Sequence, residues 1–336
     1  MFKIQNRIND PSEINSEYIA KELGLGKHVI VQFSDATFNL KLLTDLDALC
    51  KKFSSDFGVR FYGHYSSSFD FKTLLSLPNV KCLYVDCLTN ALNLETLAQL
   101  KKLEKLSLGV FELKEMEILD LPNLKNLSEL ILTETRSGAL NLDYLKDYKN
   151  LRLLIVGGHT KNIDSIGKAS KLNFLSFNSI KKTPVPFVNE LKDLRTLKFI
   201  LGGREDIREI ESNEIENLEI IRVRGFKDLG SLSSFRNLRM LLVEDNIQIK
   251  KIHFDNTLRQ LRDVKILNCQ GLNSITGIKE LTSLEQLRIY KTAIDFDNFI
   301  TQERPKSLRT FAFYTWKKKI DQDIKSKLQE LGYTED

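Results

Sequence analysis

The sequence predicts an α/β solenoid, in which one long parallel β-sheet is backed by 3₁₀ turns and short helices. Three observations predict this fold class. The 336 residues include 54 leucines, which makes leucine by far the most common apolar residue. From residue 80 to residue 313, the pattern apolar-x-x-apolar-x-apolar occurs eleven times. Successive copies begin 20–24 residues apart, a spacing typical of stacked repeats.

Each copy of the pattern predicts one strand whose apolar side chains share a face, because alternate residues of a strand point to opposite sides. A single copy cannot bury its apolar face alone, so the copies must stack. The eleven copies are Val80-Leu83-Val85, Leu103-Leu106-Leu108, Leu127-Leu130-Leu132, Leu151-Leu154-Val156, Leu172-Leu175-Phe177, Leu194-Leu197-Phe199, Leu218-Ile221-Val223, Leu238-Leu241-Val243, Leu261-Val264-Ile266, Leu284-Leu287-Ile289 and Leu308-Phe311-Phe313.

The segments between the strands have a different period. Leu94, Leu97 and Leu100 are three residues apart, and the same step recurs between later strands. A step of three places side chains on one line of a 3₁₀ helix, whereas an α-helix favours mixed steps of three and four. We therefore expect 3₁₀ turns or very short helices on the convex side of the sheet.

The repeat resembles the leucine-rich-repeat family, whose period lies in the same range. The resemblance implies a curved horseshoe with the parallel sheet on its concave face and caps at both ends. Family members place an Asn three residues after the third apolar position, where it bonds the backbone of the next turn. Here only Asn246 is such an Asn, and Cys269, Thr135 and Thr292 are expected to replace it in part. We expect an irregular horseshoe.

The whole chain, residues 1–336, is expected to be a single domain. Residues 1–79 are expected to form an N-terminal cap, residues 80–315 the eleven repeats, and residues 316–336 a closing helix. The only tryptophan, Trp316, is expected to fill the last turn of the solenoid.

The N-terminal cap is expected to have a strand–helix–strand order. Residues 28–33 and 58–62 are apolar enough for strands, and residues 40–53 carry their leucines on one face of a helix. A degenerate repeat is possible near Val59, 21 residues before Val80.

Composition and motifs give no support to an enzyme. The net charge is only +5, the first residues contain no apolar leader, and no apolar run is long enough to span a membrane. Histidines show no metal-ligand spacing, and Cys82 and Cys87 lack the second pair that a zinc site needs. We expect a cytoplasmic chain with free thiols, no catalytic residues, no metal and no cofactor. The pairs Gly157-Gly158 and Gly202-Gly203 are expected to form turns.

Between the apolar positions, the strands expose the residues that line the predicted concave face. Repeats six to eleven place ten cations and five acids there, and apolar side chains gather near the middle of the array. Charged and apolar groups on one surface indicate an interface. The candidate partner-binding residues are Leu153, Ile155, Phe174, Arg195, Lys198, Ile220, Arg222, Arg224, Arg239, Leu242, Lys265, Arg288 and Tyr290.

These observations predict a non-enzymatic module that binds another protein through its concave face, with an acidic contact surface on that partner. The free chain is expected to be a monomer. The chain resembles a stand-alone intracellular bacterial leucine-rich-repeat protein. Such proteins are similar to inhibitors or immunity proteins that neutralise a toxin, and this role is the finer hypothesis. Nucleic-acid or polyanion binding along the arginines, and a secreted effector or adhesin of internalin type, are the alternatives. Nucleic acid is the less favoured partner, because acids interrupt the basic stripe and few aromatic residues lie within it.

Overall fold

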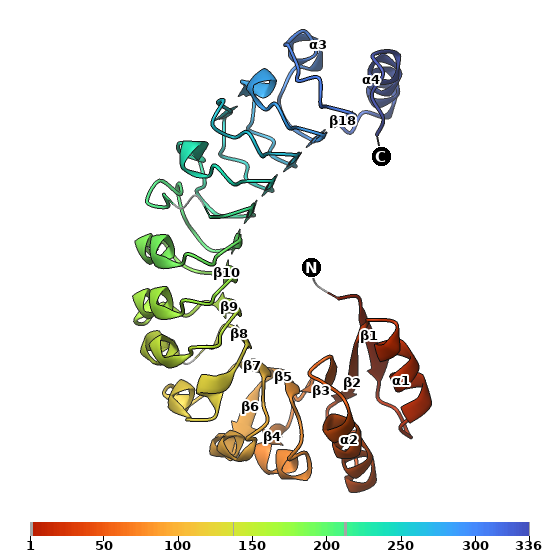
Figure 1. Cartoon of the computed structure of the whole chain (residues 1–336), viewed down its shortest axis with the longest axis vertical. Helices are drawn as coiled ribbons and strands as arrows, with labels where there is room; N and C mark the ends of the chain where they lie inside the picture. Colours follow the sequence, from red (N-terminus) through yellow and green to blue (C-terminus); the bar gives the residue numbers. More distant parts are fainter. Residues whose placement is uncertain (1–2, 137, 212–213, 336) are drawn as a thin grey trace. The chain divides into compact units, whose positions relative to one another are not determined.

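The computed structural model describes residues 3–136, 138–211 and 214–335, and the chain divides into two units, residues 1–172 and 173–336. In each unit, parallel strands lie side by side in chain order, and short helices and 3₁₀ turns follow one side of the sheet (Figure 1). We call the other side, which carries no helices, the open face of each unit.

The first unit is built on a parallel sheet that includes the cap and the first repeats. Its strands are β1 (Gln5–Asn9), β2 (His28–Ser34), β3 (Phe57–Tyr62), β5 (Cys82–Leu88), β7 (Lys105–Val110), β8 (Glu129–Leu132) and β9 (Leu153–Gly157). A separate short pair joins β4 (Ser68–Asp70) and β6 (Asn90–Leu92). The helices are α1 (Ser16–Gly24) and α2 (Leu40–Lys52), and the 3₁₀ turns are η1 (Phe71–Ser76), η2 (Leu94–Gln99), η3 (Ile118–Asp120), η4 (Leu124–Asn126), η5 (Leu142–Asp147) and η6 (Ile163–Lys168).

The second unit continues the same construction. Its strands are β10 (Phe174–Asn178), β11 (Thr196–Ile200), β12 (Asn217–Ile221), β13 (Met240–Glu244), β15 (Asp263–Leu267), β17 (Gln286–Tyr290) and β18 (Thr310–Tyr314). A short pair joins β14 (Lys251–His253) and β16 (Ser274–Thr276). The 3₁₀ turns are η7 (Pro186–Glu190), η8 (Leu232–Ser234) and η9 (Ile278–Glu280), and the helices are α3 (Phe296–Phe299) and α4 (Lys318–Glu330).

The register of the strands confirms the repeat pattern. The middle apolar residues pair between neighbouring strands, as Leu106 does with Leu83 and Leu130, and they are almost fully buried. Stacking these side chains in a row removes them from water, which is the main favourable contribution to a solenoid core. The 3₁₀ turns between the strands and the closing helix α4 are also confirmed.

The seventh repeat differs from the prediction by three residues. Leu218 pairs with Leu197 and Leu241, so it holds the middle apolar position, which was predicted for Ile221. The repeat is therefore Ile215-Leu218-Ile220, and all three side chains are fully buried. This shift removes Ile220 from the open face, contrary to the prediction.

The N-terminal cap contains the predicted strand–helix–strand, and a further strand and helix precede it. Strand β1 pairs in parallel with β2, and α1 connects the two. Asn15 and Asn39 begin the two helices, because their side chains accept hydrogen bonds from backbone N–H groups of the first turns. Strand β1 and helix α1 contain too few apolar residues to be predicted from the sequence pattern.

The missing Asn ladder is partly rebuilt by other residue types. Asn246 is buried and its amide nitrogen donates to the carbonyl oxygens of Ile220 and Glu244, at 2.8 and 2.7 Å. The Cys269 thiol makes the equivalent contacts one repeat later, as predicted, while the Thr135 and Thr292 hydroxyls form hydrogen bonds within their own loops, among the residues that the structure describes. The same position in an earlier repeat holds buried His159, whose Nε2 lies 2.9 Å from the Thr133 carbonyl oxygen.

The strands of the second unit end in a row of residues with left-handed backbone conformation. Their φ angles lie between +50° and +61°, although none is glycine, and each N–H donates to the next strand. We call these residues the strand-end row. Its members are Ser179, Leu201, Arg222, Asp245, Asn268 and Lys291. For residues other than Gly, Asn and Asp, this conformation costs roughly 1 kcal/mol each.

The glycine pairs have the expected turn geometry. Gly158 and Gly202 have φ angles of +71° and +74°. A Cβ atom on Gly202 would lie 2.2 Å from the Ile180 carbonyl oxygen, so the neighbouring loop leaves no space for a side chain. The backbone geometry thus explains these residues without a ligand.

Candidate functional site

The open face of the second unit is lined by the residues that alternate with the buried core positions. Strands β11, β12, β13, β15 and β17 each show an alternation of half-buried and buried residues. The half-buried side chains point away from the 3₁₀ turns, because side chains of a strand alternate between its faces. The open face is therefore the surface that this unit offers to a partner.

Most predicted site residues lie on or beside an open face. In the second unit, Arg195, Lys198, Leu242, Lys265, Arg288 and Tyr290 are half-buried, and Arg239 is exposed. In the first unit, Leu153 and Ile155 are half-buried in β9. The two groups belong to separate units and are described separately.

Four predicted site residues are placed differently from the expectation. Ile220 is fully buried in the core, and Phe174 is only 8% exposed because the Lys198 ammonium lies over its ring, 5.4 Å from the centroid. Arg222 and Arg224 are exposed, but both follow the end of β12 instead of lying between its apolar positions. Arg222 belongs to the strand-end row.

Most cations of the second open face are paired with acids of the same or the neighbouring strand, contrary to the predicted basic stripe. Lys198 and Glu219 are 2.8 Å apart on β11 and β12, and Lys265 and Asp263 are 2.8 Å apart on β15. Further pairs join Arg195 and Arg239 to Glu216, Arg262 to Glu285, Arg288 to Asp263, and Arg222 to Asp245. The corrected seventh repeat also adds Glu216 to this surface and removes Arg224. The predicted basic stripe is therefore largely neutralised.

One of these pairs shows the electrostatic effect clearly. The pKa of Asp245 is lowered, first by a hydrogen bond from Asn268 and second by the Arg222 guanidinium, whose Nη2 lies 2.6 Å away. Asp245 is thus held as a carboxylate between two members of the strand-end row. Arg222, Asp245 and Asn268 therefore form a fixed polar edge beside the sheet.

An apolar strip lies between the charge pairs and the strand-end row. It consists of half-buried side chains at the carboxyl ends of the strands, together with Leu242 in the middle of β13. Glu244 interrupts the strand-end positions, and Leu242 lies two residues earlier, beside Glu219 and Lys265. We call this set the apolar strip. Its members are Ile200, Ile221, Leu242, Leu267 and Tyr290. Exposed Leu201 extends it at one end, with 43% of its surface accessible.

The first unit has a more enclosed open face. Arg60 donates two hydrogen bonds to Asp86, at 2.8 and 2.6 Å, and a third to Gln32. Gln32 donates onward to Asn9, and Ser107 donates to Asp86, so one polar network crosses five strands. These polar side chains satisfy one another, which fits a structural role.

The cysteines of the chain behave as structural thiols. Burial raises the pKa of Cys82 to about 12 and that of Cys269 to about 11, so neither is a thiolate at neutral pH. Cys87 is exposed, yet its pKa is also raised, chiefly by loss of solvent around the sulfur. In the described part of the chain, no group of three or more His, Cys, Asp or Glu residues has a metal-binding arrangement.

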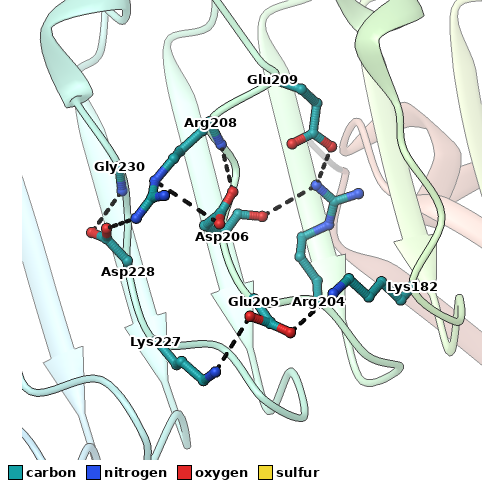
Figure 2. Close-up of polar contacts among 9 residues, drawn as sticks. All are labelled: Lys182, Arg204, Glu205, Asp206, Arg208, Glu209, Lys227, Asp228 and Gly230. Carbon is teal, nitrogen blue, oxygen red and sulfur yellow. Dashed lines mark hydrogen bonds and ion pairs between the residues drawn. The ribbon is translucent and has the colours of Figure 1, made fainter.

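A cluster of ion pairs joins three loops that follow β10, β11 and β12 (Figure 2). Glu205 lies between Lys182 and Lys227, at 2.9 and 3.3 Å, and Arg208 contacts Asp228 at 2.6 Å. These exposed pairs contribute little energy individually. They join successive repeats where residues 201–211 form no helix.

Arg204 is a half-buried member of this cluster, with 10% of its side chain exposed. Its guanidinium lies 4.5 Å from the Phe199 ring centroid and donates to Glu209 and to the Thr183 carbonyl oxygen. Burial alone would raise the pKa of Glu209, but the hydrogen bond from Arg204 lowers it overall. A cavity of about 10 Å³ beside Phe199 and Arg204 is no larger than one water. We assign this cluster to the stability of the fold.

Comparison with known proteins gives a structural likeness without a sequence match. No family model and no curated protein sequence matches the chain. The structure of an internalin, InlF from Listeria monocytogenes, matches with a TM-score of 0.59 at 18% identity, over 94% of this chain and 87% of that one. The chain has the leucine-rich-repeat fold. A chain of the Toll–Spätzle complex from Drosophila matches this leucine-rich-repeat chain at a TM-score of 0.52 and 14% identity.

The second match covers 96% of this chain but 48% of the Toll–Spätzle chain, so the leucine-rich-repeat chain spans about half of that protein's length. At such identities the likeness extends to the fold. Among the described helices, none combines the length and the hydropathy needed to cross a membrane.

Proposed function

We propose that this leucine-rich-repeat chain binds another protein through the open face of its second unit, without catalysing a reaction. The apolar strip carries this proposal. Its side chains lie half-exposed in neighbouring strands, between a band of ion pairs and the strand-end row. An apolar centre with a polar surround is the usual composition of a protein interface.

The strip is also presented by a rigid element. Parallel strands hold its side chains at fixed spacings, and the ion pairs immobilise the neighbouring long side chains. A preformed surface loses little conformational entropy on binding, so more of the contact energy appears as affinity. The chain is proposed to act as a cytoplasmic monomer before it binds.

The ion pairs alter the expected chemistry of the partner. Because most cations of the open face already have acidic neighbours, we propose that the partner covers the strip with apolar and neutral polar groups. An acidic contact surface on the partner remains part of the proposal. That surface must bind to cations of this chain that have no acidic neighbour. A polyphosphate chain along this face would meet Glu244, Asp263 and Glu285, which disfavours nucleic acid.

The test is an affinity capture from lysate of the native host, with and without nuclease, followed by mass spectrometry. Leu242→Glu places a charge at the member of the strip on β13, between Glu219 and Lys265 of the neighbouring strands. Ile247→Glu is the matched control at a side chain that is 60% exposed outside the strands. We expect one nuclease-resistant protein that Leu242→Glu releases and Ile247→Glu retains. Equal recovery with both variants, or recovery that nuclease abolishes, would contradict the proposal.

The finer hypothesis is that the captured protein is a toxin and that the chain is its inhibitor. A partner whose active surface is covered would lose its activity at equimolar chain. An activity assay of the captured protein, with wild type and Leu242→Glu, distinguishes inhibition from simple association. A partner that stays fully active when saturated with the chain would exclude the inhibitor role.

A further inference from the structure

Three consecutive lysines of the second unit lie just after its last strand. Lys317, Lys318 and Lys319 are exposed, and they lie at the start of α4. The ion pairs of this helix are made by Lys325 and Lys327, further along the chain. The three consecutive lysines have no acidic partner among the residues that the structure describes.

Trp316 lies directly beside these lysines and is held outward. Its side chain is 61% exposed, contrary to the expectation that it fills the last turn. Its φ of +86° is rare for a bulky residue. The Asp321 carboxylate fixes this segment by accepting hydrogen bonds from the backbone N–H groups of Thr315 and Trp316, at 2.6 and 3.2 Å. Asp321 is thereby occupied with the backbone.

The exposed indole already binds a cation within the chain. The Lys291 ammonium lies 3.6 Å from the Trp316 ring centroid. Lys291 belongs to the strand-end row, and the preceding residue, Tyr290, belongs to the apolar strip. The Tyr290 ring contacts Tyr314 of β18 edge-on, with 4.9 Å between centroids. These contacts place Trp316, which directly precedes the three lysines in the chain, beside the end of the proposed binding surface.

We call this surface the terminal patch. It combines three aromatic rings, four lysines and one exposed aliphatic side chain. Its members are Tyr290, Lys291, Tyr314, Trp316, Lys317, Lys318, Lys319 and Ile320.

We propose that the terminal patch binds an acidic segment of a protein partner, in which carboxylates alternate with apolar residues. This inference rests on the proposed function, and it names the part of the partner that meets the end of the strip. Carboxylates pair with the unpaired lysines, and apolar side chains pack on Trp316 and Ile320. Charge complementarity of this kind determines association rate and orientation.

Two other ligand classes fit the patch less well. A single-stranded nucleic acid uses several open aromatic faces for stacking, whereas Lys291 covers one face of Trp316 and the two tyrosines contact each other edge-on. A membrane surface needs a broader apolar area than Trp316 and Ile320 provide. A protein segment uses a few anchors together with several charges, and the patch offers both.

The test uses the only tryptophan of the chain as its reporter. Intact protein is titrated with a short synthetic peptide rich in glutamate and leucine, and Trp316 fluorescence is recorded. The comparison probes are the same peptide with glutamine for glutamate, an oligo-deoxythymidine, and vesicles containing phosphatidylserine. We expect saturable binding of the acidic peptide, at an affinity above those of the other three probes.

The variant Lys317→Gln/Lys318→Gln/Lys319→Gln should weaken this affinity about tenfold, as expected for the loss of three exposed charge pairs. The matched control Lys250→Gln/Lys251→Gln/Lys306→Gln removes three exposed lysines elsewhere in the second unit and should retain affinity within about twofold. Circular dichroism confirms that both variants are folded. Equal loss in both variants, or tighter binding of oligonucleotide, vesicles or glutamine peptide, would overturn the inference.

This experiment and the lysate capture can fail independently. The inference about the terminal patch is refuted, and the proposed function is not, if the captured protein is released by Leu242→Glu and fully retained by the triple lysine variant. The proposed function is refuted if no nuclease-resistant protein is captured, whatever the peptide titration shows.

Discussion

Asn246 provides the most direct test of how the repeats are held together. Its side chain is 1% exposed and makes three hydrogen bonds in the second unit. Its amide nitrogen donates to the Ile220 and Glu244 carbonyl oxygens, and its oxygen accepts from the Val223 N–H at 3.0 Å. These bonds connect two successive repeats at a point where both backbones leave their strands.

The variant Asn246→Ala removes all three bonds and leaves the buried Val223 N–H without this acceptor. A buried polar group without a partner costs about 1–3 kcal/mol. The carbonyl of Glu244 also accepts from Arg222, so it remains satisfied. The unsatisfied Val223 N–H, the lost hydrogen bond to the Ile220 carbonyl oxygen and a small cavity together should lower the free energy of unfolding by about 2–4 kcal/mol.

Equilibrium urea unfolding, followed by circular dichroism and by Trp316 fluorescence, measures this loss. The matched control is Asn237→Ala, since Asn237 is half-buried and its side chain accepts one exposed hydrogen bond from Gln260. The control should change the free energy of unfolding by less than about 0.5 kcal/mol. If Asn246→Ala shifts the unfolding midpoint no more than Asn237→Ala does, the ladder position does not hold the repeats together.

Three further predictions follow from buried contacts. Burial lowers the pKa of His159, so its contribution to stability should be complete above the pKa of an unfolded histidine and should fall as the pH drops below that value. His159→Asn should reduce this loss of stability in unfolding titrations at neutral and acidic pH. An unchanged pH dependence would contradict the assignment. Gly202→Ala should destabilise by more than about 1 kcal/mol in thermal melts, because its Cβ meets the Ile180 carbonyl oxygen. Gly203→Ala should be neutral, because its Cβ would make only an ordinary contact with the Arg224 carbonyl oxygen, at 3.9 Å; equal effects would disprove the steric argument. Arg204→Met should lower the free energy of unfolding by about 2–4 kcal/mol, since Glu209 and the Thr183 carbonyl oxygen lose their hydrogen-bond donor. The matched variant Arg208→Met, at an exposed arginine, should lower it much less. Similar melting temperatures for the two variants would show that Arg204 does not stabilise the fold.

The spacing of the leucines was sufficient to predict the fold and the strands of the repeats. One residue type recurs at a nearly constant step, and only a stack of parallel strands buries that pattern. The seventh repeat shows the limit of this reasoning. Around Leu218, both Leu218-Ile221-Val223 and Ile215-Leu218-Ile220 match the motif, and both give steps within the observed range. Only the pairing of Leu218 with Leu197 and Leu241 distinguishes them.

The candidate surface was predicted in outline, but its electrostatics were not. Alternation along each strand correctly placed residues such as Lys198, Lys265 and Leu242 on the open face. Whether a cation is paired depends on which residue lies beside it on the next strand, about twenty residues away in sequence. Lys198 meets Glu219 and covers Phe174 for this reason. A count of charges along the chain contains no information about such neighbours.

The C-terminal cap illustrates a second limit. An isolated aromatic residue near the end of a solenoid is most simply interpreted as core, and Trp316 is exposed because Asp321 fixes its backbone from the following helix. A side chain five residues away thus determines the direction of the indole. Sequence patterns that rely on apolar periodicity do not detect such a polar anchor.

The strand-end row has a consequence for protein engineering. Ser179, Leu201, Arg222 and Lys291 hold a backbone conformation that glycine or asparagine adopts more easily. Replacing Ser179 or Leu201 with glycine or asparagine would remove this backbone cost, whereas the side chains of Arg222 and Lys291 also contact Asp245 and Trp316. A scaffold derived from this chain therefore offers a series of sites at which side chains can be exchanged in register, one per repeat, to give new binding specificities on an unchanged frame.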